Sequence, residues 1–347
     1  MTANQFSRRT FLGGTAAGAG LLLGGGSLLT ACSGSSEPPA AAPLTPVNFH
    51  LSWFDSVQFG GSYLADTNGH YAGQGLDVSL VPGGPGVSPD AAVAAGQAIM
   101  GISAANFAGQ SVADGAPFKI VGVAMQRNPF VIASLTSNPV NEPKDLEGRR
   151  LGMAFNNQLD LELLSSLNGV DVNAIEVIQA DYDPAPLVNG EVDCLLCWLV
   201  DLPVAMTVAG IDNTTMLFAD FGYAVHSQTY IVTDDTLANN RDTVLGLLRG
   251  EILGWQDHKA DPATAAQVTV DRFPDAGMDL ETETIKASEF TKLMFSDVTD
   301  ASGFLWWTDQ SVQDNIRVLK ALGVNVTEAF WDRSLLEEIY ADGPVLS

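Results

Sequence analysis

Short apolar runs alternate with stretches of helical periodicity from residue 47 onward, and this alternation is the strongest structural signal in the chain. Ser88 and Pro89 stand where a helix would begin, because serine is a favoured N-cap and proline suits the first turn. The β-α-β-α-β order predicts parallel strands joined by right-handed crossovers. The strands are predicted at residues 47–54, 76–81, 99–102 and 120–125, and the helices at residues 59–71, 88–95 and 104–113.

The same alternation is repeated in a second unit, which follows a strand at residues 130–136. Its strands are predicted at residues 150–155, 175–180 and 192–197, and its helices at residues 158–167, 184–189 and 202–209. Two further strands, at residues 216–221 and 229–233, are expected to carry the chain back to the first unit. The remainder is mostly helical and is expected to pack on the first lobe, with helices at residues 241–258, 261–273, 282–295, 309–322 and 334–341.

These elements predict an α/β fold of two lobes with a hinge and a central ligand cleft. The first lobe is expected to contain residues 47–135 and 224–347, and the second lobe residues 136–223. Two crossing segments, near residues 134–137 and 221–227, would connect the lobes and serve as the hinge.

The first 46 residues follow a different pattern, with paired arginines, an apolar stretch and then a proline-rich segment. Arg8 and Arg9, in Ser-Arg-Arg-Thr-Phe-Leu, are typical of a twin-arginine export signal. The sequence Leu-Thr-Ala-Cys, which ends at Cys32, is typical of a lipoprotein cleavage box. An ordinary N-terminal helix is disfavoured, because many glycines interrupt the apolar stretch. We therefore predict a signal peptide at residues 1–31, a lipid on Cys32, a flexible tether at residues 32–46 and a site of action outside the cytoplasmic membrane.

The chain is strongly acidic, with a formal net charge of −25. Residues 1–31 carry two arginines and no acidic residue, so their removal would leave a charge of −27. A basic surface for nucleic acid is therefore not expected. After residue 31 no apolar run is long enough for a membrane-spanning helix.

Side chains with catalytic or metal-binding chemistry are few in this sequence. Cys194 and Cys197 have the spacing of a Cys-x-x-Cys motif, but no second pair or nearby histidine completes a metal site. Residues three apart in a strand face opposite sides, so buried thiols are favoured over a disulfide. The histidines show neither metal spacing nor a nucleophile motif; they are His50, His70, His226 and His258. No cofactor or metal is expected, although an exported enzyme that uses the cysteine pair with a bound metal is an open alternative.

A glycine-rich turn, Pro82-Gly83-Gly84-Pro85-Gly86, follows a predicted strand and precedes a predicted helix. Such a turn can approach a phosphate, but it lacks the Lys-Ser/Thr of a nucleotide loop and the spacing of a dinucleotide fingerprint. A tight-turn role is therefore favoured.

Aromatic rings and neutral amides recur where the predicted strands end, at the edge where open α/β sheets bind ligands. Flat rings can flank a planar ligand, and amides can read its donors and acceptors. This combination predicts a small, flat and mostly neutral heteroaromatic ligand. The candidate ligand-binding residues are Trp53, Gln58, Asn106, Gln126, Asn128, Asn156, Asn157, Trp198, Asp201, Tyr223 and Tyr230.

Several segments resemble the extracytoplasmic solute-binding proteins of ABC importers, in the branch that binds thiamine pyrimidine precursors, riboflavin, taurine and aliphatic sulfonates. The resembling segments are Leu51-Ser52-Trp53 and residues 69–78, 94–97, 143–152 and 189–193. The resemblance implies a two-lobed clamshell of the type II periplasmic binding proteins. It also implies a monomer that delivers a small molecule to membrane permease subunits.

Within this branch, the chain looks most similar to the pyrimidine-precursor binders. The similarity makes Trp53 a stacking residue and Gln126 and Asn128 polar ligand contacts, while Arg127 stands where those proteins usually have histidine. Binding of a thiamine pyrimidine precursor or a riboflavin-like ring is the expected function. Binding of a sulfonate, taurine or nitrate is the alternative within the family. A fungal pyrimidine synthase shares the fold, but it carries a cysteine-rich run that Cys194 and Cys197 are too few to match.

Overall fold

The computed structural model describes residues 43–346 apart from residues 85, 155–156 and 181–182. Contacts between residues divide the chain into two units, Met1–Ala41 and Ala42–Ser347, and the described residues belong to the second unit. The predicted signal peptide, the predicted lipid site at Cys32 and most of the tether lie outside the described residues, as does Asn156. Within the described part of the chain, no helix is long and apolar enough to cross a bilayer.

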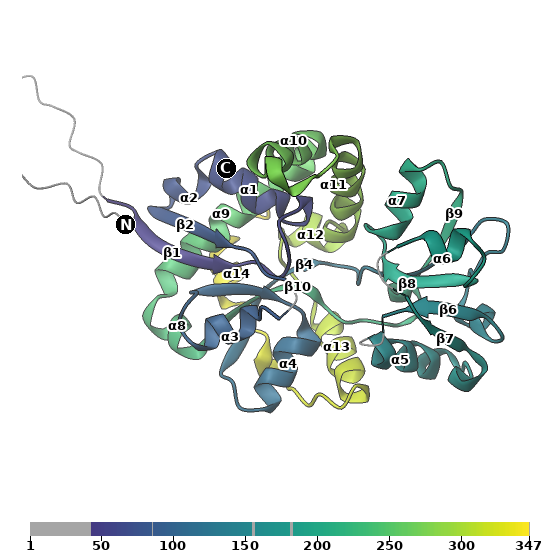
Figure 1. Ribbon diagram of the computed structural model, residues 1–347. Helices are drawn as coiled ribbons and strands as arrows, with labels where there is room; N and C mark the ends of the chain where they lie inside the picture. Colours follow the sequence, from purple (N-terminus) through teal and green to yellow (C-terminus); the bar gives the residue numbers. More distant parts are fainter. Residues whose placement is uncertain (1–42, 85, 155–156, 181–182, 347) are drawn as a thin grey trace, which may run out of the picture. The chain divides into compact units, whose positions relative to one another are not determined.

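Two five-stranded sheets form the framework (Figure 1). The first contains β1 (Thr45–His50), β2 (Leu76–Val81), β3 (Met100–Ser103), β4 (Phe118–Met125) and β10 (Ser227–Thr233). The second contains β5 (Phe130–Leu135), β6 (Arg150–Met153), β7 (Glu176–Gln179), β8 (Cys194–Trp198) and β9 (Asn213–Leu217). The strand orders are β2-β1-β3-β10-β4 and β7-β6-β8-β5-β9, so the second sheet repeats the topology of the first.

Most of the helices that connect the strands lie where the sequence pattern predicted them. In the first sheet they are η1 (Val57–Phe59), α1 (Gly60–Thr67), α2 (His70–Gly73), α3 (Pro89–Ala94) and α4 (Ala105–Ala113). In the second they are η2 (Pro143–Leu146), α5 (Gln158–Asn168), η4 (Val172–Ala174), α6 (Ala185–Val188), α7 (Leu202–Val208) and η5 (Phe218–Phe221). The helix predicted at residues 59–71, however, is broken into shorter ones, η2 and η4 were not predicted, and η5 occupies the end of a predicted strand. The predicted cap of α3 is confirmed, because Ser88 Oγ accepts the Ala91 N–H at 3.2 Å.

The remaining helices cover the first sheet. They are α8 (Asp234–Asn239), α9 (Arg241–Ala260), α10 (Pro262–Arg272), η6 (Pro274–Ala276), α11 (Leu280–Met294), α12 (Asp297–Ser302), α13 (Asp309–Ala321), η7 (Glu328–Phe330) and α14 (Ser334–Ile339). Helix α9 packs on α1 and α2, α13 on α4, and α14 on β4. A side chain at Gly254 is excluded, since its Cβ would lie 2.1 Å from the Gly61 carbonyl oxygen of α1. Helices α8 and α12 were not predicted.

The strands predicted to be parallel run in one direction within each sheet, whereas β10 and β5, for which no direction was predicted, run against their neighbours. β1 runs parallel to β2 and β3, and β6 runs parallel to β7 and β8. β10 is antiparallel to β3 and β4, and β5 is antiparallel to β8 and β9. Each reversed strand enters its sheet directly from a crossing segment, so no helical crossover restores the direction.

The predicted lobe boundary at residue 135 also needs correction. β5 pairs with β8 and β9 in the second sheet, although the sequence pattern assigned it to the first lobe. The strand at the end of the second unit, β9, likewise stays in the second sheet, and β10 alone returns to the first. The chain therefore crosses between the lobes at residues 126–129 and 222–226, and Figure 1 shows these two connections between the blue and the teal sheets.

Candidate functional site

Three exposed aromatic side chains follow neighbouring strands of the first sheet. Trp53 and Phe54 come after β1 and are 42% and 56% exposed, and Phe107 comes after β3 and is 68% exposed. The rings of Trp53 and Phe54 meet edge to face, with centroids 5.4 Å apart. Because β1 and β3 are parallel neighbours, their carboxyl ends share one edge of the sheet. We call Trp53, Phe54 and Phe107 the aromatic edge.

The glycine-rich turn supports this edge by close backbone packing. The Gly83 N–H donates to the Trp53 carbonyl at 2.9 Å. A Cβ on Gly83 would lie 2.6 Å from the Ser52 carbonyl carbon, and one on Gly84 would lie 2.9 Å from the Phe54 ring. The predicted tight-turn role is confirmed, since only glycine allows these approaches.

Two buried glutamines form an amide pair beside the aromatic edge. Gln58, in η1, donates through Nε2 to Gln228 Oε1 at 3.5 Å and to Ser52 Oγ at 3.4 Å. Gln228 Nε2 donates to the Gln58 carbonyl at 3.3 Å. Gln228 has a φ of 48°, a left-handed conformation that costs a non-glycine residue about 1–3 kcal/mol and is typical of functional sites. A glutamine amide has two donors and an oxygen that can accept two bonds, and these hydrogen bonds use only part of that capacity.

Asn106 adds an unused acceptor next to the aromatic edge. It precedes Phe107 in the first turn of α4 and is half-buried. Its Oδ1 atom is buried and has no hydrogen-bond partner among the described residues. A buried amide oxygen without a partner is costly, so a donor on a ligand would be favoured there.

The carboxyl edge of the second sheet presents a different set of predicted residues. Trp198 ends β8 and its ring meets that of Phe130 edge to face, with centroids 6.4 Å apart. Asn157 precedes α5 and is half-buried, and Leu159 in that helix is 59% exposed. Asp201 precedes α7 but makes no capping hydrogen bond.

Helix α11 connects the two edges. It contacts η1 of the first lobe and α7 of the second lobe. Buried Glu283 accepts the Val57 N–H at 3.1 Å and pairs with Lys286 Nζ at 2.8 Å. Burial raises the pKa of Asp201 to about 6, while Lys286 lowers that pKa and Glu283 raises it. No sequence signal singles out Glu283 and Lys286, because an acidic and a basic residue three apart in a helix are an ordinary surface pattern.

Two of the predicted ligand-binding residues, Tyr223 and Tyr230, lie in the core. Tyr223 is buried against Phe130 and Phe218, and its hydroxyl donates to Asp160. Tyr230 is buried in the first lobe and donates to Glu251 at 2.6 Å. Core packing thus uses both rings, and buried carboxylates use both hydroxyls.

Gln126 and Asn128, which were also predicted to contact the ligand, form hydrogen bonds within the protein. Gln126 Nε2 donates to the carbonyls of Val123 and Trp306, each at 3.0 Å. Asn128 is 5% exposed; its Nδ2 donates to the Val225 carbonyl at 3.0 Å, and its Oδ1 accepts the Phe130 N–H at 3.1 Å. Asn128 thereby joins the two crossing segments of the hinge.

Two ionisable side chains of the crossing segments, Arg127 and His226, are also engaged with protein partners. Arg127 forms an ion pair with Asp220, which lies just before the second crossing. His226 accepts from Trp331 Nε1 at 3.3 Å, and burial lowers the pKa of its imidazole to about 3, so it is neutral at pH 7. Both Arg127 and His226 therefore have partners within the protein.

The two cysteines point to opposite faces of β8, as predicted. Cys194 belongs to one apolar cluster, with Leu196, and Cys197 belongs to the other, with Leu195. Burial raises the pKa of both thiols, that of Cys194 to about 12. Among the residues that the structure describes, no group of three histidine, cysteine, aspartate or glutamate side chains is placed to hold a metal ion.

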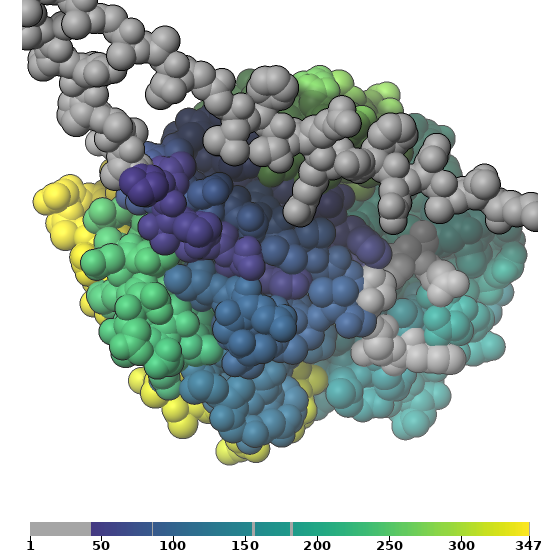
Figure 2. All heavy atoms as spheres, turned by 60° about the vertical axis from the view of Figure 1, so that its left-hand side comes forward, coloured from purple at the N-terminus to yellow at the C-terminus, as the bar shows by residue number. Residues whose placement is uncertain are grey.

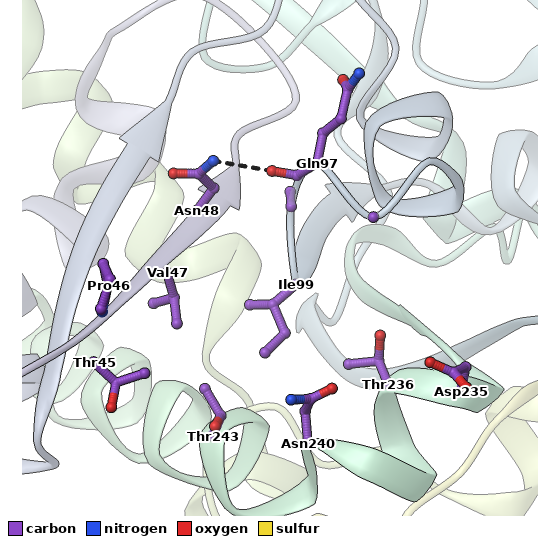
Figure 3. Close-up of a pocket in the computed structure, with 12 residues that line it drawn as sticks. Thr45, Pro46, Val47, Asn48, Gln97, Ile99, Asp235, Thr236, Asn240 and Thr243 are labelled. Atoms are coloured by element: carbon purple, nitrogen blue, oxygen red, sulfur yellow. Dashed lines mark hydrogen bonds between the residues drawn. The ribbon is translucent and has the colours of Figure 1, made fainter.

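A pocket of about 570 Å³ opens at the opposite edge of the first sheet (Figure 3). On the face seen in Figure 2, purple β1 lies beside the green segment of α8 and α9, and these elements supply part of its lining. Asn48 Nδ2 donates there to the Gln97 carbonyl at 3.0 Å. The pocket lies at the amino ends of β1 and β3, and its lining contains hydroxyls and amides but no aromatic ring. It therefore lacks the surface that a planar ligand requires.

Sequence comparison identifies two curated relatives of different kinds. Riboflavin-binding protein RibY of Chloroflexus aurantiacus is 24% identical over 250 residues, which cover 69% of this chain and 70% of RibY. The 4-amino-5-hydroxymethyl-2-methylpyrimidine phosphate synthase of Schizosaccharomyces pombe is 26% identical over 150 residues, which cover 42% of this chain and 43% of the synthase.

Comparison with solved structures confirms the predicted two-lobed α/β fold class. The aliphatic sulphonate binding protein SsuA of Escherichia coli matches with a TM-score of 0.61 at 13% identity, over 80% of this chain and 91% of that chain. A Candida albicans protein described as having the generic periplasmic binding protein fold matches with a TM-score of 0.53 at 15% identity, over 88% and 99%. At these identities the likeness concerns the fold alone. Residues 56–265, more than half of the chain, match the family described as NMT1/THI5 like, and the protein therefore belongs to the NMT1/THI5-like family.

Proposed function

We propose that this protein is the solute-binding component of an ABC importer and that it captures a small, flat, mostly neutral heteroaromatic. The observation that carries the proposal is the aromatic edge, where three exposed rings stand beside the Gln58–Gln228 amide pair. Exposed rings supply stacking surface, and amides select for hydrogen-bond donors and acceptors on the ring edge. A riboflavin-like ring or a thiamine pyrimidine precursor fits this chemistry, and the names of the two curated relatives support it.

The pairing of the positively charged side chains near the carboxyl ends of the strands favours a neutral ligand over a sulfonate. Arg127 is paired with Asp220, and Lys286 is paired with Glu283, so both cations already have carboxylate partners. An anion would have to compete with those carboxylates, and the net charge of −25 would oppose its approach. Sulfonate binding by structural neighbours at 13% identity does not outweigh this argument.

A binding role is favoured over the enzymatic alternative by the position of the cysteines. An exported redox or metal enzyme would need Cys194 and Cys197 to act together. Their side chains lie in separate apolar clusters on opposite faces of the sheet, with thiols whose pKa is raised by burial. Protonated buried thiols are poor nucleophiles and poor metal ligands.

The ligand is tested by isothermal titration of the purified protein with riboflavin, 4-amino-5-hydroxymethyl-2-methylpyrimidine, taurine, an alkanesulfonate and nitrate. Saturable binding of a heteroaromatic, and none of the anions, is expected. Trp53→Ala should weaken that binding about 10- to 100-fold through loss of stacking area. Val188→Ala, an exposed apolar residue of α6, serves as the matched control and should bind like the wild type. Binding of only sulfonates or nitrate would overturn the ligand assignment.

We further propose that Cys32 anchors the protein by lipid outside the cytoplasmic membrane, so that the ligand is passed to a nearby permease. The Leu-Thr-Ala-Cys sequence and the preceding arginine pair support this location. Cys32→Ser should move the protein from the membrane fraction to the soluble extracytoplasmic fraction, while ligand affinity stays unchanged. Retention of the Cys32→Ser protein in the membrane fraction would contradict the anchor.

A further inference from the structure

Three charged side chains lie where the lobes touch through helix α11. Glu283 and Lys286 belong to α11 in the first lobe, and Asp201 precedes α7 in the second lobe. Helices α11 and α7 are in contact, and Figure 1 shows them facing each other between the two sheets. The three groups therefore occupy an interface whose geometry depends on the position of one lobe relative to the other.

Glu283 holds Lys286 in place and also links it to the ligand-facing loop. Its Oε1 atom binds Lys286 Nζ at 2.8 Å, and its Oε2 atom accepts the Val57 N–H at 3.1 Å. Val57 follows the loop that carries Trp53 and Phe54. Glu283 is buried, so these two bonds satisfy a carboxylate that would otherwise be costly.

Of the three charged groups, the carboxylate of Asp201 is the one without a hydrogen-bond partner in the described part of the chain. Its side chain does not cap α7, and no hydrogen bond to it is present among the described residues. Lys286 and Glu283 are the charged groups that act on this carboxylate, and both belong to α11. A carboxylate without a donor next to a preorganised ammonium group gains a charge-assisted hydrogen bond if the two approach.

We propose that Lys286 is a positioning residue for ligand capture: it pairs with Asp201 when the second lobe closes against α11, while Glu283 keeps Lys286 aligned with the Trp53 loop. The inference rests on the proposed function in taking lobe closure as the event that captures ligand. Lys286 acts through the interface between the lobes and does not touch the ligand itself. Glu283 and Lys286 would thus connect the loop that carries Trp53 to Asp201, and the Lys286–Asp201 pair would stabilise the closed arrangement of the lobes.

Disulfide trapping tests the approach of the two residues without any ligand. Asp201→Cys and Lys286→Cys are combined in a Cys32→Ser background, and the rate of disulfide formation is measured in a redox buffer. The matched control pairs Asp201→Cys with Lys292→Cys, which lies six residues, about 9 Å, further along the same helix. A disulfide requires Cα atoms about 4.4–6.8 Å apart, so we expect the 201–286 pair to form at least about fivefold faster. Equal rates would overturn the proposal.

Affinity measurements test the charge interaction, with riboflavin and 4-amino-5-hydroxymethyl-2-methylpyrimidine as probes. Lys286→Met should weaken binding of whichever probe binds the wild type about 5- to 10-fold. Lys286→Arg should restore affinity to within about twofold, and Lys292→Met, which breaks the similar Glu289–Lys292 pair, should change it by less than about twofold. Combining Asp201→Asn with Lys286→Met should cost no more than Lys286→Met alone. If Lys286→Met binds with wild-type affinity, the proposal is overturned. If neither probe binds the wild type, the proposed ligand is contradicted, and the disulfide-trapping result decides the role of Lys286.

Discussion

Replacing Asn128 by alanine tests whether this side chain serves the hinge or the ligand. The amide is 5% exposed and makes two hydrogen bonds, to the Val225 carbonyl and from the Phe130 N–H. Alanine removes both bonds and leaves two backbone groups without their partner. Each such loss in a buried setting costs about 1–3 kcal/mol, so loss of both should lower the free energy of unfolding of Asn128→Ala by about 2–6 kcal/mol.

Urea denaturation followed by tryptophan fluorescence measures this change. Asn173→Ala, at an exposed asparagine of the second lobe, is the matched control and should stay within about 0.5 kcal/mol of the wild type. The ligand affinity of Asn128→Ala should fall by less than about threefold, because the substitution loosens the hinge but removes no ligand contact. Wild-type stability combined with a loss of affinity greater than tenfold would refute the hinge assignment and return Asn128 to the ligand site.

Two further predictions concern pH. Burial raises the pKa of Glu251 above its unfolded value of about 4.3, so the folded state holds this proton more tightly and the free energy of unfolding falls as pH rises from about 4.3 toward the raised pKa. Glu251→Gln should abolish that contribution, so the free energy of unfolding of the variant should rise relative to that of the wild type between pH 4 and pH 7 in urea titrations. If the free energies of unfolding of the two proteins change in parallel with pH, this prediction is contradicted. Asp201, faced by Lys286 and Glu283 of α11 and by Cys197 of β8, has a pKa near 6 and pairs with Lys286 only when ionised. Ligand affinity should therefore weaken as pH falls from 7.5 to 5, and Asp201→Asn should flatten the profile measured by titration calorimetry.

Local patterning predicted most of the elements well. The strand at Leu76–Val81 has the predicted bounds, and the helix at Gln158–Asn168 differs from the prediction by one residue. The Ser88 cap and the opposite orientation of the two cysteines followed from the same local rules. These features depend on the periods of 2.0 and 3.6 residues, which are present in any short stretch of chain.

The candidate site was predicted less completely, because a residue at the end of a strand can face either solvent or the core. Trp53 is exposed as expected, whereas Tyr223 and Tyr230 are buried with their hydroxyls bound to carboxylates. Asp160 and Glu251, the two carboxylates, are far from their tyrosines in sequence. No local pattern reports such a pairing.

The sequence by itself determined the alternation of strands and helices, the two-unit organisation and the place of the aromatic residues at strand ends. The tertiary structure alone decided that β5 and β10 run against their neighbours, that Asn128 joins the two crossing segments, and that Glu283 and Lys286 lie between the lobes. The physical reason is the range of the interactions. Periodicity and caps act over a few residues, whereas strand direction, burial and pairing between lobes arise from contacts between segments that are distant in the chain.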